Sequence, residues 1–300
     1  MDLPPTFGNH PRNRHQGLPV MLERHLACLG PSGFHRVAYS EWPGPAGAPA
    51  LVCVHGLSRN GRDFDALAEA LSKDYRVVCP DMAGRGRSEW LSNPADYSFP
   101  LYLADCVALI ARLDVEKVDW LGTSMGALIG MMLAAQRGNP IGKLVLNDAG
   151  AFVAKEGLNR IGAYLGNDPT FDSLEAMEAA LRANYVSYGS LTDAQWRKMA
   201  LDSARKKPEG GYGFAYDPRI GDPFKAGPVS DVDLWPVWDG IQRPTLLLRG
   251  ETSDVLQRDV AEAMTMRGPK AKLVEFKGVG HAPPLLNDDE IGAVRDFLLG

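Results

Sequence analysis

A serine between two glycines, in the run G-T-S-M-G at residues 122–126, is the strongest chemical signal in this 300-residue chain. A strand-like apolar run ends just before it and a helix-like run, residues 125–136, begins within it, which is typical of a strand–turn–helix elbow. Such a turn strains the backbone of Ser124, and the glycines let strand and helix approach closely. The Met125 amide would lie at a helix N-terminus, which favours an oxyanion. The pattern predicts a nucleophilic serine; the alternative is an inert serine in a tight turn.

A serine hydroxyl is a weak nucleophile, so a nucleophilic serine needs a histidine base. Of the six histidines, only His281 follows Ser124, and in chains with this kind of elbow the base comes last. His281 lies in the loop 278–284, after the final predicted strand. Because parallel strands end at one edge of a sheet, this loop should reach Ser124. We predict that His281 is the base; the alternative is a surface histidine with a structural hydrogen bond.

The base in turn needs a carboxylate that fixes its tautomer. The loop after the apolar run 245–249 supplies Asp254 and, as a second choice, Glu251. The rival is Asp148, just past the preceding apolar strand. We predict Asp254, because its loop adjoins the strand that leads to His281. Asp148 is then expected to shape the floor of the cleft or the start of the next segment.

The first buried strand runs into His55 and Gly56. Gly56 permits a sharp turn, and we expect the Leu57 amide to face the Met125 amide as the second oxyanion donor. His55 is predicted to brace this loop by hydrogen bonds rather than to act as a base. The polar turn at 81–88 is expected to tie loops together near the site. Three residues of the next loop are either solvated or contacts for a polar substrate group: Arg59, Asn60 and Arg62.

Strand and helix signals alternate along most of the chain, after a leading hairpin at about 23–29 and 35–42. The alternation indicates right-handed crossovers and a parallel sheet. Strands are predicted at 50–54, 75–80, 115–121, 143–146, 245–249 and 271–276, and helices at 61–72, 101–113, 125–136, 174–184, 258–266 and 288–299. A further helix should follow the capping box of Thr192 and Gln195. The expected organisation is an N-terminal arm (1–20), an α/β core (21–150 and 236–300) and an inserted helical cap (151–235).

Composition narrows the class of protein. A net charge of -5 argues against non-specific binding to nucleic acid or to an anionic membrane. No apolar run is long enough for a membrane span and residues 1–15 lack a secretory signal, so a cytoplasmic location is expected. The four cysteines lie in apolar stretches without C-x-x-C spacing, and neither a metal motif nor a dinucleotide fingerprint is present, so no cofactor or metal is predicted. The expected partner is a small-molecule substrate, and the formation of a homodimer is left open.

Together these landmarks resemble the α/β-hydrolase superfamily. They are His55-Gly56, the D-x-x-G-x-G-x-S turn at 81–88, the serine elbow, the loop 250–254 and Gly280-His281. The resemblance implies an α/β fold with a mostly parallel eight-stranded sheet flanked by helices, and no metal or organic cofactor. It also implies a catalytic triad and an oxyanion hole: Ser124, Asp254 and His281 for the triad, and the amides of Leu57 and Met125 for the hole.

The favoured hypothesis is a serine hydrolase that cleaves a small carboxylic ester, thioester or lactone through an acyl-enzyme on Ser124. Serine at this position disfavours relatives with an aspartate nucleophile. The alternatives are a C–C bond hydrolase of a ring-cleavage product, a cofactor-free perhydrolase, and a hydrolase-like ligand receptor with little turnover. Such C–C hydrolases usually carry a glycine-rich run after His-Gly and an Asn before the serine. Here Leu57-Ser58-Arg59 and Thr123 stand at these positions, so the C–C hydrolase is less favoured. The predicted substrate contacts are Arg59, Tyr188, Trp196 and Trp235, among cap aromatics that partly form the cap's own core.

Overall fold

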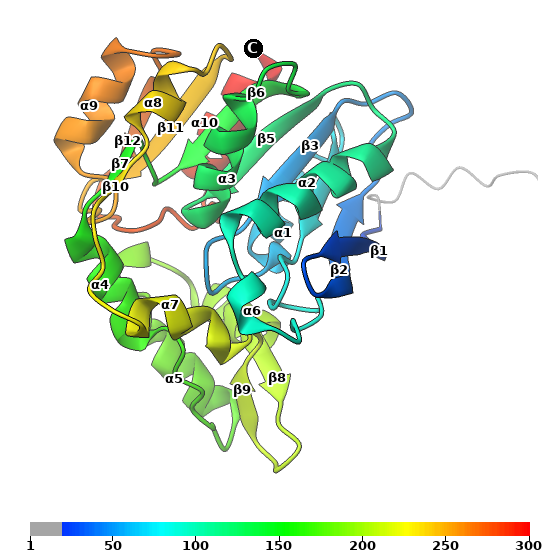
Figure 1. Cartoon of the computed structure of the whole chain (residues 1–300), viewed down its shortest axis with the longest axis vertical. Coiled ribbons are helices and arrows are strands. Elements are labelled where there is room, and N and C mark those ends of the chain that lie inside the picture. Colours follow the sequence, from blue (N-terminus) through cyan, green and yellow to red (C-terminus); the bar gives the residue numbers. More distant parts are fainter. Residues whose placement is uncertain (1–19) are drawn as a thin grey trace, which may run out of the picture.

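The computed structural model describes residues 20–300, so the predicted arm lies, except for its last residue, outside the described residues. Within residues 20–300, eight strands form one sheet in the order β1-β2-β4-β3-β5-β6-β11-β12 (Figure 1). They are β1 (Leu22–Gly30), β2 (Gly33–Trp42), β3 (Ala50–Val54), β4 (Arg76–Pro80), β5 (Val118–Thr123), β6 (Ile141–Asn147), β11 (Thr245–Gly250) and β12 (Lys272–Phe276). β2 pairs antiparallel with β1 and β4, and all other neighbours pair in parallel. The predicted mostly parallel sheet is confirmed.

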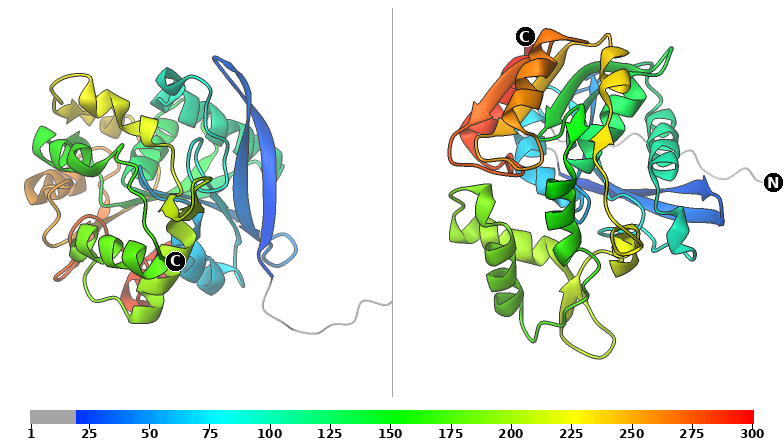
Figure 2. Two further views of the ribbon diagram at one scale, coloured as in Figure 1. Left: turned by 90° about the horizontal axis from the view of Figure 1, so that it is seen from below. Right: turned by 60° about the vertical axis from the view of Figure 1, so that its left-hand side comes forward.

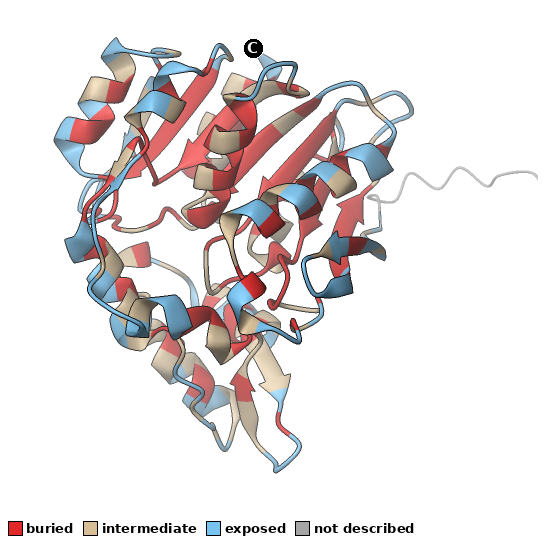
Figure 3. Ribbon diagram, in the orientation of Figure 1, coloured by how far each residue is buried: buried red, intermediate tan, exposed pale blue. Residues whose placement is uncertain are grey.

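Helices cover both faces of this sheet. They are α1 (Asp65–Leu71), α2 (Phe99–Leu113), α3 (Met125–Ala134), α8 (Trp235–Asp239), α9 (Arg258–Met266) and α10 (Asp288–Leu299). Along β3, Val52 and Val54 pack in a cluster with α2 and α3, whereas Leu51 and Cys53 pack in a second cluster with α1 and α10. Burial on both faces explains why the strands read as continuous apolar runs (Figure 3). In residues 20–300 every helix is too short or too polar to span a lipid bilayer.

The chain between β6 and β11 forms a separate layer of structure. Its elements before α8 are β7 (Phe152–Val153), α4 (Lys155–Tyr164), α5 (Leu174–Asn184), α6 (Asp193–Ser203), β8 (Ala204–Lys206), β9 (Tyr212–Phe214), α7 (Asp222–Lys225) and β10 (Val232–Asp233). Figures 1 and 2 show α4, α5, α6 and the β8–β9 hairpin gathered on one side of the molecule, next to the carboxyl edge of the sheet. Helix α5 and the capping box of α6 are confirmed. The small β8–β9 and β7–β10 pairs and helix α4 were not predicted, and the division into core and cap stays a prediction.

Candidate active site

Ser124 occupies a strained turn between β5 and α3. Its φ is 52° and its ψ is -113°, a backbone region that residues with a side chain rarely adopt. A Cβ atom on Gly122 would lie 2.1 Å from the backbone of Gly126, and one on Gly126 would lie 2.0 Å from the carbonyl oxygen of Val54. Only glycine therefore lets β3, β5 and α3 meet behind the serine. The predicted elbow is confirmed.

Ser124, His281 and Asp148 form a continuous hydrogen-bonded chain. Ser124 Oγ lies 2.9 Å from His281 Nε2, and His281 Nδ1 lies 2.8 Å from Asp148 Oδ2. The Asp148 side chain is fully buried, and that of His281 is 11% exposed. A carboxylate at Nδ1 favours the tautomer in which Nε2 can accept the proton of the serine. The predicted contact between Ser124 and His281 is confirmed.

The structure corrects the predicted acid, because Asp254 does not contact His281. The Asp254 side chain is 45% exposed and pairs with Nε and Nη2 of Arg160, on α4. The second choice, Glu251, accepts a hydrogen bond from the Gly278 amide at 2.8 Å. Both carboxylates are therefore engaged away from the imidazole.

Asp148 takes this place because of where β6 ends. β6 pairs with β5 on one side and with β11 on the other, so the residue that follows it lies between the serine elbow and the loop after β11. The Asp148 carboxylate accepts hydrogen bonds from the Gly250 amide at 2.9 Å and from the Ser253 hydroxyl at 2.6 Å. The loop that we expected to supply the acid instead supplies donors that hold it.

The amides of Leu57 and Met125 remain the candidate oxyanion hole. Both residues line the space beside Ser124, and Met125 begins helix α3. In the part of the chain that the structure describes, neither main-chain amide donates a hydrogen bond to another residue. The Leu57 carbonyl, in the next peptide group, accepts a hydrogen bond from Arg85 Nε at 2.9 Å, which anchors the loop at this residue. Both amides therefore lack a partner in the described residues, as donors of an oxyanion hole must.

His55 braces the neighbouring loops, as predicted. Its Nδ1 donates to the Gly56 carbonyl at 2.6 Å, and its Nε2 accepts from the Met82 amide at 2.9 Å. Burial lowers the pKa of His55 to about 4, so the ring stays neutral in this arrangement. Asp81, in the polar turn, accepts a hydrogen bond from the Gly61 amide at 2.8 Å. The turn therefore ties loops together near the site, as predicted.

A large apolar cavity adjoins Ser124 on the Met125 side. Its volume is about 390 Å³. Its walls come from α2, α3, α4, α7 and the loops around them, and include Phe99, Tyr102, Leu128, Met132, Val153, Leu158, Ile161, Ile220, Phe224, Leu234 and Val255. We call this space the apolar cavity. Its size and lining are suited to a hydrocarbon-rich group of a substrate.

A smaller space, which we call the polar recess, adjoins Ser124 on the side of His281. It measures about 40 Å³, and the polar residues in its walls include Ser58, Arg59, Thr123, Arg160, Tyr164, Asn184, Tyr185 and Tyr188. His281 borders only this space, whereas Met125 borders only the apolar cavity. Ser124 therefore has an apolar space on one side and a polar space on the other.

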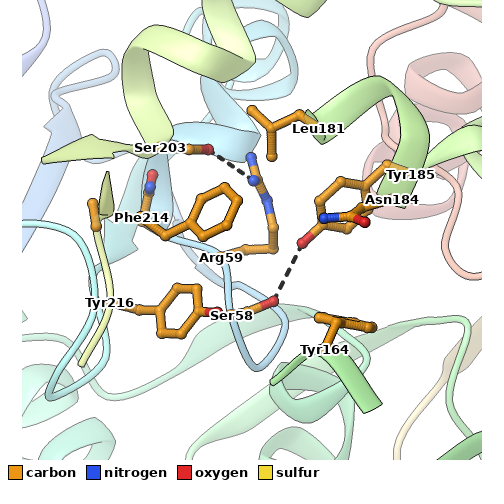
Figure 4. Close-up of a pocket in the computed structure, with 11 residues that line it drawn as sticks. Ser58, Arg59, Tyr164, Leu181, Asn184, Tyr185, Ser203, Phe214 and Tyr216 are labelled. Carbon is orange, nitrogen blue, oxygen red and sulfur yellow. Dashed lines mark hydrogen bonds between the residues drawn. The ribbon is translucent and has the colours of Figure 1, made fainter. Parts of the chain in front are cut away.

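The recess adjoins a chamber of about 20 Å³ whose walls include Arg59 and Tyr185 (Figure 4). A dashed line in this view marks the hydrogen bond that Arg59 Nη1 donates to Ser203 Oγ. Its length is 2.8 Å, and the guanidinium lies 5.3 Å from the centre of the Tyr185 ring. Arg59 also pairs with Asp63 and is only 6% exposed, so the solvated alternative is wrong for this residue. Its neighbours serve the loop: Asn60 caps the turn that precedes α1, and Arg62 pairs with Asp65.

Two of the four predicted substrate contacts reach the site and two do not. Arg59 and Tyr188 line the polar recess. Trp196 instead packs in the apolar cluster between α5 and α6, and Trp235 lies under the guanidinium of Arg267 at 4.5 Å. Neither tryptophan lines the apolar cavity or the polar recess in the described residues, which corrects those two predictions.

Helix α4, at Lys155–Tyr164, contributes to both spaces but was not predicted from the sequence. It places Arg160 and Tyr164 in the polar recess and Leu158 in the apolar cavity. The apolar spacing of Leu158, Ile161 and Leu165 follows a helical period and was the available signal. Gly157 and Gly162, which are weak helix formers, obscured it.

One group of side chains in the described residues has the spacing of metal ligands. The ligand atoms of Cys28, His35 and Asp105 all lie within 4.8 Å of one another, and all three residues are buried. His35 Nε2 lies 3.0 Å from Asp105 Oδ2, and burial raises the pKa of Cys28 to about 12. A protonated thiol beside an imidazole–carboxylate pair is a hydrogen-bonded network that joins the β1–β2 hairpin to α2. All four cysteines are free and buried, which confirms the predicted burial.

Comparisons with known proteins agree with this fold and site. The model of the alpha/beta hydrolase family matches residues 51–294. The chain therefore belongs to the alpha/beta hydrolase family. It is 46% identical over 285 residues to a 3-hydroxybutyrate-oligomer hydrolase from Cupriavidus necator, a match that covers 92% of this chain and 97% of the relative.

Two solved structures are similar along almost the whole chain. A putative hydrolase from Rickettsia typhi superposes with a TM-score of 0.86 at 32% identity, over 93% of this chain and 99% of that one. An alpha/beta hydrolase from Novosphingobium aromaticivorans superposes with a TM-score of 0.85 at 36% identity, over 94% of this chain and 99% of that one. Fold and relatives together support a hydrolase of the esterase type.

Proposed function

We propose that this hydrolase cleaves carboxylic esters through an acyl-enzyme on Ser124, with His281 as the base and Asp148 as its orienting acid. The observation that carries the proposal is the hydrogen-bonded chain from Ser124 Oγ through His281 to the buried Asp148 carboxylate. Two amides that have no hydrogen-bond partner within residues 20–300, those of Leu57 and Met125, lie beside it. This combination supports attack on a carbonyl carbon and stabilisation of the resulting oxyanion.

In the proposed mechanism, Ser124 Oγ attacks the ester carbonyl while His281 Nε2 takes the hydroxyl proton. The carbonyl oxygen becomes an oxyanion that accepts hydrogen bonds from the two amides, and Asp148 stabilises the imidazolium. The bond to the alcohol oxygen then breaks, and His281 gives its proton to the departing alcohol. Water attacks the acyl-enzyme by the same steps and releases the acid.

We further propose that the substrates are short oligomers of 3-hydroxybutyrate. The relative that carries this activity in its name is 46% identical along nearly its whole length. Such oligomers contain ester bonds between short, methyl-branched units. An apolar cavity of about 390 Å³ next to the nucleophile suits a chain of such units.

The test is Ser124→Ala, assayed with p-nitrophenyl butyrate and with a 3-hydroxybutyrate trimer. Loss of the nucleophile should lower kcat by roughly 10⁴-fold or more on both substrates. A fluorophosphonate should label the parent protein at Ser124, seen by mass spectrometry, and should not label the variant. Turnover by Ser124→Ala at the parent rate would refute the acyl-enzyme.

The parent protein's own substrate profile separates the remaining alternatives. Turnover of p-nitrophenyl butyrate without cleavage of the trimer would overturn the substrate class alone. Stoichiometric labelling of Ser124 with negligible turnover on all esters would instead favour a ligand receptor.

A further inference from the structure

The two spaces beside Ser124 have unequal roles in ester cleavage. The histidine that takes the proton of the serine returns it to the leaving alcohol, so the alcohol portion of the ester must lie on the side of His281. His281 borders the polar recess and not the apolar cavity. The alcohol portion of a substrate therefore occupies the polar recess, and the acyl portion extends into the apolar cavity.

Hydrogen-bond donors are prominent among the polar groups that line the recess. In residues 20–300, no Asp or Glu lines either the recess or the adjoining chamber. The groups that do line them include two guanidiniums, from Arg59 and Arg160, and the hydroxyls of Tyr164 and Tyr185. A wall of donors without a carboxylate suits an anionic ligand group.

Most donor groups of Arg59 are already bonded to other protein side chains. Its Nε and Nη2 donate to Asp63, its Nη1 donates to Ser203, and its face stacks on Tyr185. It contributes positive charge but presents little of its donor surface to a ligand, because only 6% of the side chain is exposed.

Arg160 is placed differently. Its side chain is 43% exposed, and Asp254 occupies only the edge formed by Nε and Nη2. The other edge of the guanidinium is formed by Nη1 and Nη2. In the described part of the chain, this edge makes no hydrogen bond to protein other than the one from Nη2 to Asp254. A guanidinium can bind a carboxylate at each edge, so Arg160 can hold a second one in bidentate geometry while Asp254 keeps it in position.

We propose that the polar recess binds a carboxylate on the alcohol portion of the substrate, and that Arg160, positioned by Asp254, is the cation that binds it. This inference rests on the ester hydrolysis proposed above. In a 3-hydroxybutyrate oligomer, the alcohol portion with a free carboxylate is the carboxyl-terminal unit. The recess, at about 40 Å³, is much smaller than the apolar cavity, at about 390 Å³, so the short unit leaves and the long portion is the acyl group. The enzyme therefore removes one unit at a time from the carboxyl end.

The first experiment compares a 3-hydroxybutyrate trimer with the same trimer whose terminal carboxylate is a primary carboxamide. The parent protein should prefer the acid by about 10- to 100-fold in kcat/KM, the range expected for charge-assisted hydrogen bonds. Arg160→Gln should reduce this preference at least tenfold, mainly through KM for the acid. Arg160→Lys should restore part of it, because it keeps the charge without the fork. Arg258→Gln, which removes an exposed arginine paired with Glu262 on α9, is the matched control and should keep the parent preference.

The second experiment uses a trimer labelled with ¹³C only in its carboxyl-terminal unit. The first labelled product, followed by mass spectrometry at low conversion, should be the monomer. A labelled dimer as the first product would overturn the proposal.

The outcomes separate the two proposals. Equal kcat/KM for acid and carboxamide in the parent, or a preference that Arg160→Gln leaves unchanged while thermal melting shows a folded variant, would overturn the carboxylate site alone. Failure of the parent to cleave either trimer would overturn the proposed substrate class and the carboxylate site with it.

Discussion

Replacing each of the two candidate acids, Asp148 and Asp254, by asparagine in separate variants gives the sharpest test of the site. Asp148→Asn removes the charge beside His281 but keeps the size of the side chain. Asparagine also tolerates the φ of 57° found at this position, so the backbone should hold. Asp254→Asn removes the carboxylate that pairs with Arg160 and leaves the imidazole untouched.

The magnitudes differ widely because the two carboxylates have different surroundings. Replacing the acid that fixes the imidazole tautomer should lower kcat by roughly 10³- to 10⁴-fold, or ~4–5.5 kcal/mol of barrier. The asparagine has one acceptor oxygen for the donors Gly250 and Ser253, so one of them loses its partner, at about 1–3 kcal/mol of folding stability. Asp254 makes a half-exposed pair, and such pairs are worth about 0–1 kcal/mol. On a small uncharged ester, Asp254→Asn should stay within about fivefold of the parent.

The assay is initial-rate hydrolysis of p-nitrophenyl butyrate by parent and both variants, with circular dichroism melting curves to show that each is folded. A folded Asp148→Asn protein with near-parent kcat would refute the reasoning. So would a larger loss in Asp254→Asn than in Asp148→Asn.

Two further outcomes follow from buried groups. Burial lowers the pKa of His55 to about 4 in the folded protein, against about 6.5 in the unfolded chain, and a proton on Nε2 would also oppose the Met82 amide. The stability that neutral His55 contributes is therefore full above about pH 6.5 and is lost as the pH falls towards 4, by ~3 kcal/mol in total. Urea unfolding at pH 7 and pH 4.5 should therefore show a smaller acid-induced loss in His55→Gln than in the parent, and equal losses would contradict this. Gly126→Ala should prevent folding or lower the free energy of unfolding by more than about 4 kcal/mol, because its Cβ would lie 2.0 Å from the Val54 carbonyl oxygen. The control is Gly292→Ala on α10, where nothing lies within 4 Å of the added Cβ. This variant should fold normally and melt no lower than the parent.

Features with a strong local cause could be predicted from the sequence. The elbow needs glycine at fixed positions around Ser124, and strands buried on both faces read as apolar runs, so β3 was placed at residues 50–54 without error. Helix α9, at Arg258–Met266, was also placed correctly. His281 followed from chain order, since no other histidine comes after the serine.

The choice of acid depends on tertiary placement, which the sequence does not express locally. Asp148 and Asp254 both follow apolar strands, so chain position alone cannot separate them. Two hydrogen bonds hold Asp148 beside His281, because Gly250 and Ser253 donate to it from the loop that carries Asp254. A pairing between loops that lie about 100 residues apart leaves no periodic signal in the chain.

Helix α4 carries a consequence for redesign of this hydrolase. Of the two spaces beside Ser124, Leu158 lines only the apolar cavity, Arg160 and Tyr164 line only the polar recess, and Ile161 lines both. If an ester binds as proposed above, neighbouring positions on this one helix contact its acyl portion and its alcohol portion separately. Libraries that vary Leu158 should alter which acids the protein accepts, libraries that vary Arg160 should alter which alcohols it releases, and Ser124 with its strained turn need not change in either.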